Sequence, residues 1–217
     1  MPSLRRLIKG LSALFWGLPI TLLVCVQSSI TDWLKPLGAF PPIAATALLL
    51  YGLFQLGHFQ KQERVWRDAL DVARLFGVVN LGLSPFIFLW NKLPHVVFYT
   101  QVVSVMALSS LLFLFSLNRV LQRLTAMLPD ETLRAETKLF TGMNIYLMAG
   151  ILVLVTLFLL LRQIDNLPQL VIVMIDIMMQ VRQLLLLFMV LLPLAMTMTL
   201  LWKIKEIVLS GIFGQDQ

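Results

Sequence analysis

Residues 96–117 read VVFYTQVVSVMALSSLLFLFSL, an apolar run that contains no charged side chain. A helix of about 20 apolar residues spans the ~30 Å hydrocarbon core of a bilayer. Backbone N–H and C=O groups cannot stay unpaired in lipid, so an apolar run of this length is expected to be helical. This stretch therefore predicts a transmembrane helix.

The rest of the chain has the same character. Of its 217 residues, 59% are hydrophobic and only 13% are charged, and the mean hydropathy is +0.88. Soluble domains average about 45–50% apolar and about 25% charged residues. Five further apolar runs cover approximately residues 11–26, 41–57, 75–90, 139–161 and 184–202. We predict an all-α, polytopic membrane bundle of about six transmembrane helices, forming one domain over residues 1–217 of a plasma or inner membrane protein.

The positive charges predict the orientation of this bundle. With the N-terminus inside, thirteen Lys and Arg residues fall in the inner segments and three in the outer ones, with Arg182 unassigned. Such an excess is typical of cytoplasmic segments, so both termini are expected in the cytoplasm. The same rule accounts for the net charge of +6. We therefore expect no nucleic acid among the partners.

Two inner segments, residues 58–74 and 118–138, are longer and more charged than the outer loops. Glu63 and Arg67, and then Asp71 and Arg74, have the spacing of ion pairs on a helix. Such segments are helix extensions at the lipid headgroups or a docking surface for a soluble cytoplasmic partner, and the sequence leaves both readings open.

A weak internal similarity relates two parts of the chain. Residues 74–81 (RLFGVVNL) align with residues 138–145 (KLFTGMNI), 64 residues later, and the offset superposes the preceding helix and loop. Spans 2–3 and 4–5 would then be parallel helical-hairpin repeats, as found in many transporters, although hydrophobic helices also resemble one another by coincidence.

The last apolar segment carries a stripe of polar side chains. At 100° per residue, Gln169, Asp176, Gln180 and Gln183 share one narrow helical face. Residues 167–182 are expected either to lie in the membrane interface with this stripe facing water, or to extend the last span with the stripe facing other helices. The second placement makes Asp176, Gln180 and Gln183 candidate functional residues.

Two asparagines lie within predicted spans. Asn80 and Asn144 are both about two turns from the inner end of their helices. Amides at this depth commonly form hydrogen bonds between helices, and the alternative is a substrate site.

Motifs for known chemistry are missing from the sequence. It has no phosphate-binding loop, dinucleotide fingerprint or His-Glu-x-x-His motif, and its two histidines, His58 and His95, fall at opposite membrane faces in the predicted topology. We therefore expect no catalytic residues, no bound cofactor and no metal site, and hence no enzyme.

Two functions remain as expectations. The first is a non-catalytic subunit or scaffold of a membrane assembly, in contact with the lipid bilayer and with other membrane subunits or further copies of itself. The alternative is a small transporter or channel component, for which the arguments are the repeat, the polar stripe and the two helices that Pro85 and Pro193 are expected to kink.

Overall fold

The computed structural model describes residues 2–31, 33–59, 62–127, 131–161 and 190–209. These parts are helical and contain no β-strand, which confirms the all-α prediction for them. The helices are α1 (Pro2–Ile30), the short 3-10 helix η1 (Lys35–Leu37), α2 (Phe40–Leu56), α3 (Arg64–Leu83), α4 (Pro85–Lys92), α5 (Val97–Ala126) and α6 (Glu131–Leu161). A further helix, called helix 190–209 below, covers those residues.

Three described segments are long and apolar enough to cross a membrane. They are Leu4–Ile30, Arg64–Lys92, which includes both α3 and α4, and Val97–Ala126. The apolar α2 is shorter, with 17 residues, or about 25 Å at 1.5 Å per residue. These apolar helices are the ones expected of a membrane protein.

The predicted third span, residues 75–90, lies within a longer helical segment. Its helix begins eleven residues earlier, at Arg64, and continues past a break at Ser84 into α4. The early start follows from the apolar side of the first turns, where Trp66, Leu70 and Ala73 are buried. The spacing of the charges in residues 58–74 predicts such a helical extension.

The break at Ser84 is stabilised locally. Pro85 has no N–H, so it cannot donate the helical hydrogen bond to the Leu81 carbonyl. The Ser84 hydroxyl donates to that carbonyl instead, at 2.8 Å. A kinked helix is tolerated in a membrane when side chains satisfy the released backbone groups in this way.

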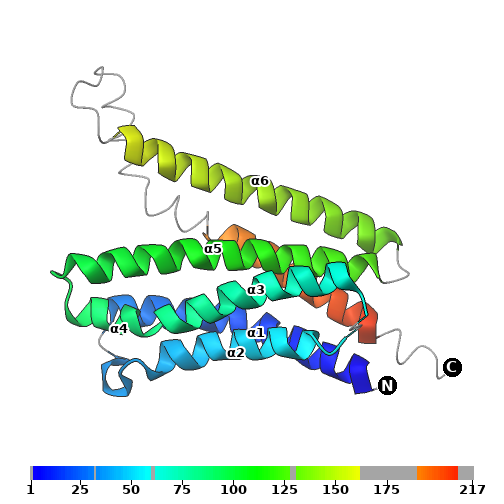
Figure 1. Ribbon diagram of the computed structural model, residues 1–217, viewed down its shortest axis with the longest axis horizontal. Coiled ribbons are helices and arrows are strands. Elements are labelled where there is room, and N and C mark those ends of the chain that lie inside the picture. The colour runs from blue at the N-terminus through cyan, green and yellow to red at the C-terminus, as the bar shows by residue number, and fades with distance from the viewer. Residues whose placement is uncertain (1, 32, 60–61, 128–130, 162–189, 210–217) are drawn as a thin grey trace.

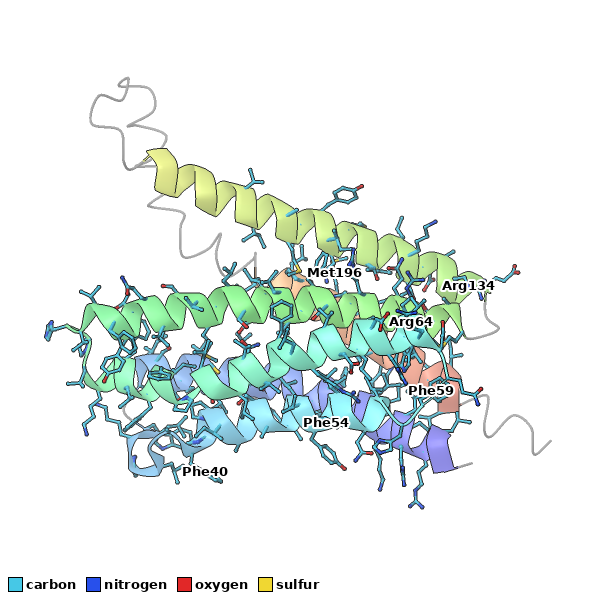
Figure 2. All side chains as sticks on the ribbon, in the orientation of Figure 1. Phe40, Phe54, Phe59, Arg64, Arg134 and Met196 are labelled. Carbon is cyan, nitrogen blue, oxygen red and sulfur yellow. The ribbon has the colours of Figure 1, made fainter. Side chains whose placement is uncertain are left out.

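Successive helices run in opposite directions, except that α4 continues in the direction of α3 (Figure 1). The starts of α1, α3 and α6 and the ends of α2, α5 and helix 190–209 therefore meet at one end of the bundle, called the basic end below. Figure 2 shows Phe59, Arg64 and Arg134 at this end and Phe40 at the other. The basic residues in these helix ends are Arg5, Arg6, Lys9, Arg64, Arg67, Arg74, Arg119, Arg123, Arg134, Lys138, Lys203 and Lys205.

The hydrophobic core is concentrated near the basic end. Its fully buried side chains include Leu7 and Leu11 of α1, Leu56 of α2 and Trp66 of α3. The same cluster continues through the end of α5 and helix 190–209 with Leu117, Leu121, Leu124, Leu200, Leu201 and Ile204. The helices are thus held together most firmly where their charged ends meet.

Candidate functional site

The structure describes two of the five residues that the sequence singled out. Asn80 and Asn144 lie on α3 and α6, and both are buried. Asp176, Gln180 and Gln183, together with the proposed interfacial segment 167–182, lie outside the described residues. The candidate site is therefore built from the surroundings of the two asparagines.

Asn80 contacts a neighbouring helix with its side chain. The Ser110 hydroxyl of α5 lies 3.5 Å from Asn80 Oδ1, at the limit of a hydrogen bond. Ser110 also donates to the Met106 carbonyl of its own helix at 2.8 Å. Asn80 therefore makes a weak link between α3 and α5.

Asn144 belongs to a tighter cluster that joins three helices. Thr197 of helix 190–209 accepts hydrogen bonds from Asn118 Nδ2 of α5 at 2.9 Å and from Asn144 Nδ2 at 3.2 Å. The Thr197 hydroxyl donates to the Pro193 carbonyl at 2.7 Å. All three side chains are at most 1% exposed. The sequence did identify Asn144, but not the two residues that contact it.

Hydrogen-bond capacity fixes the orientation of both amides. A threonine hydroxyl has one hydrogen and two lone pairs, so Thr197, donating to Pro193, can only accept from its two neighbours. Asn118 Nδ2 also donates to the Leu114 carbonyl at 2.9 Å, and Asn144 Nδ2 to the Pro193 carbonyl at 3.4 Å. Flipping either amide would place two acceptors against each other.

The consequence is a group of buried oxygen atoms without hydrogen-bond partners among the described residues. Asn118 Oδ1 and Asn144 Oδ1 belong to it, as do the hydroxyl oxygens of Thr137 and Thr141. Thr137, Thr141 and Asn144 follow one another at helical spacing on the buried side of α6, and both threonines are fully buried. An unsatisfied buried polar group costs about 1–3 kcal/mol, so four together are unusual in a purely structural cluster.

Charged and aromatic side chains lie next to this cluster, toward the basic end. Lys203 of helix 190–209 forms an ion pair with Glu136, the residue before Thr137. The Lys203 ammonium also lies 5.9 Å from the centre of the Phe140 ring. Both partners of the ion pair are partly exposed, whereas the neighbouring Thr137 is fully buried.

A second group of charges lies between α2 and α3. Arg74 is paired with Asp71 at 2.9 Å, as their spacing predicted, and its guanidinium carbon lies 5.0 Å from the centre of the Phe54 ring. The side chain covers Gly57, where a Cβ atom would collide with the guanidinium. These contacts fasten the ends of two helices together.

The arrangement has the chemistry of neutral oxygen and amide groups. Among the described residues, no three His, Cys, Asp or Glu side chains come together as a metal site would require. His58 and His95 lie at opposite ends of the bundle, after α2 and before α5. The Asn118–Thr197–Asn144 cluster can join helices, and its free oxygen atoms can accept hydrogen bonds or coordinate a cation.

Comparison with protein-family models, with curated proteins and with solved structures finds no match to this chain.

Proposed function

We propose that this chain is a non-catalytic, multi-pass subunit or scaffold of a membrane assembly, with six spans and both termini in the cytoplasm. Its partners would be other membrane subunits or further copies of itself. A soluble cytoplasmic partner would dock at the basic end, through residues 58–74 and 118–138. The arguments come from the way the buried polar groups are used and from the surface of the helices.

The observation that carries the proposal is that buried and half-buried side-chain hydrogen bonds connect helices. Asn118, Thr197 and Asn144 link α5, α6 and helix 190–209. Asn91 of α4 donates to the Ser28 and Thr31 carbonyls at 3.0 and 3.3 Å, and Thr21 of α1 donates to the Ala45 carbonyl of α2 at 3.0 Å. Such bonds are worth about 0.6–2 kcal/mol each within a membrane and suit a rigid scaffold.

The outer face of α6 supports a contact with membrane partners. It presents a stripe of large apolar side chains at helical spacing, and Tyr146 in its middle is 81% exposed. The other members of the stripe are Leu139, Met143 and Val153. Lipid or a neighbouring helix would cover this apolar surface equally well. Experiment has to distinguish these two occupants of the surface.

The alternation of the helices supports the proposed topology. The described basic residues of the predicted inner segments lie at the basic end, whereas Lys35 and Lys92 lie near the opposite end. The positive-inside rule assigns the basic end to the cytoplasm. The predicted spans 139–161 and 184–202 fall in α6 and partly in helix 190–209.

Burial supports the proposed repeat of two hairpins. At the 64-residue offset α2 corresponds to α5, and α3 with α4 corresponds to α6; Figure 1 shows both members of each pair running in the same direction. Buried positions coincide at Pro42/Met106, Ala45/Ser109, Leu49/Phe113, Gly52/Ser116, Leu53/Leu117, Leu56/Val120, Ala73/Thr137, Gly77/Thr141, Asn80/Asn144, Ser84/Met148 and Ile87/Ile151. Thr46 and Leu70 are exceptions, because their counterparts Ser110 and Arg134 are exposed. Further exceptions are Leu114, Asn118 and Leu121, whose counterparts Leu50, Phe54 and Gly57 are not buried.

A transport component is the second candidate, and the unpartnered oxygen atoms near Asn144 favour it. Parallel repeats and kinked helices occur in transporters, whose substrate sites lie within the bundle. Accessibility distinguishes the two functions. In a Cys25→Ser background, Asp176→Cys should react with water-soluble reagents from both sides in different states if the chain transports, and from one side only if it is a scaffold.

The scaffold proposal is tested by the mass of the native particle. The chain is extracted gently from its own membrane into lipid nanodiscs and weighed by native mass spectrometry. We expect a particle containing other subunits, or several copies of the 24.7 kDa chain, at fixed stoichiometry. A uniform monomer at every extraction condition would contradict the proposal.

A further inference from the structure

Four buried oxygen atoms on α5 and α6, beside helix 190–209, have no partner among the described residues and form the basis of a binding site. We infer that Asn118, Thr141 and Asn144 bind a small monovalent cation of the alkali-metal class, with Thr137 one turn further toward the basic end. This inference goes beyond the scaffold proposal and does not depend on it, because a scaffold and a transporter can both hold an ion.

The first argument is that the amide hydrogens near the site are already used. Asn118 donates to Leu114 and Thr197, and Asn144 donates to Pro193 and Thr197. Each amide has two hydrogens, so neither has one left for a ligand. Both amides therefore present only their carbonyl oxygens, Asn118 Oδ1 and Asn144 Oδ1, which have no partner.

The second argument is the position of Thr141. In the antiparallel α5–α6 hairpin, Thr141 lies on α6 one turn before Asn144, on the same fully buried side of the helix. Its hydroxyl oxygen has no partner among the described residues. Thr141 thus adds a third neutral oxygen to the side of α6 that carries Asn144.

The third argument is the chemistry of these ligands. An anion would need hydrogen-bond donors, and soft metal ions would need sulfur or imidazole. Calcium and magnesium are normally bound with carboxylates, whereas the buried side chains identified here are neutral. Carbonyl oxygens without carboxylates replace the hydration shell of alkali ions in channel filters, and transporters coordinate sodium with similar groups.

The fourth argument is the charge balance beside the site. Glu136 is partly exposed and is followed by the buried Thr137 and, one turn further, by Thr141. Lys203 is paired with Glu136 and lies beside the Phe140 ring, so the positive charge near the site is balanced by a carboxylate. Figure 2 shows Met196, the neighbour of Thr197, where helix 190–209 passes α5 and α6.

The first repeat provides a natural control. At the 64-residue offset, Asn80 corresponds to Asn144, Gly77 to Thr141, Ala73 to Thr137 and Phe54 to Asn118. The equivalent place in the first hairpin therefore lacks three of the four oxygen-bearing side chains. Its asparagine Oδ1 lies 3.5 Å from the Ser110 hydroxyl, whose shorter hydrogen bond goes to the Met106 carbonyl.

The inference is tested on the full chain in nanodiscs at constant ionic strength. Thermal unfolding is followed by tryptophan fluorescence in lithium, sodium, potassium or N-methylglucamine chloride, and binding of radioactive sodium is measured directly. We expect at least one alkali ion to raise the melting temperature in a saturable manner, with N-methylglucamine having no effect. Equal stabilisation by all four salts, or no saturable effect of any of them, would overturn the inference and leave water as the occupant.

Variants connect the effect to the named oxygen atoms. Thr141→Val keeps the shape of the side chain and should weaken ion binding about tenfold, as the loss of ~1.4 kcal/mol implies. Asn80→Leu, the matched control in the first hairpin, should leave ion binding unchanged. Asn144→Leu should abolish binding, and Thr141→Val keeps the test decisive if this stronger change prevents folding. Wild-type affinity in Thr141→Val would count against the site.

Discussion

Gly10 of α1 and Gly52 of α2 lie so close that a Cβ atom on Gly10 would be 2.9 Å from the Gly52 carbonyl oxygen. That contact involves backbone, which cannot move aside as a side chain can. Small residues allow such approaches between membrane helices, and van der Waals packing over the contact then holds the helices together.

Gly10→Ala should therefore destabilise the protein. We expect a loss of about 1–3 kcal/mol, the usual cost of inserting a methyl group into a packed contact. Gly82→Ala is the control, because nothing lies within 4 Å of a Cβ atom there and alanine favours a helix. Unfolding in nanodiscs or detergent measures both, and equal stability of the two variants would contradict the close approach.

Thr197→Val tests the cluster of three helices. The change removes the hydroxyl that accepts from Asn118 and Asn144 but keeps the shape, and we expect a loss of about 1–3 kcal/mol. Thr199→Val is the matched control, since this exposed threonine donates to the Ala195 carbonyl of its own helix at 2.9 Å and has no other side-chain hydrogen bond within the described residues. If both variants unfold alike, the cluster adds nothing to stability.

Glu136→Gln tests the ion pair with Lys203. Both side chains are partly exposed, so the free energy of unfolding should change by no more than about 1 kcal/mol. Raising the salt concentration should reduce even this difference because screening weakens exposed pairs. A much larger loss would show that Glu136 has a role beyond this pair.

Reporter fusions test the topology. Fusions after Lys35, Lys92 and Asn166 should report an outside location, and those at Glu63, Pro129 and Gln217 an inside one, because the basic segments stay in the cytoplasm. The fusion at Lys92 is the most informative. An inside signal there would remove the third span and reverse the orientation of every helix that follows.

The sequence was sufficient to predict the helices, because long apolar runs have few other stable forms. In the first turns of α3, which bury Trp66 and Leu70 beneath charged neighbours, the spacing of the charges and not the hydropathy indicates the helix. The start of α6 at Glu131, by contrast, follows the acidic residues that favour a helix N-terminus.

The polar cluster could be predicted only in part. Asn144 was conspicuous in an apolar run, whereas Asn118 directly follows the predicted span 96–117 and was assigned to the inner segment. Thr197 has a hydropathy near neutral, so it does not stand out from the apolar residues around it. Its distance from Asn144 and Asn118 along the chain, 53 and 79 residues, explains why only a folded structure brings the three together.

The interruption at Ser84 has a mechanical consequence. In an unbroken helix, rotation of one half turns the other half, because the hydrogen-bond ladder is continuous. Here the Ser84 hydroxyl replaces one rung at the Leu81 carbonyl, and α4 beyond it is tied to α1 through Asn91. We therefore expect α3 and α4 to rotate more independently of each other than the two halves of a continuous helix would.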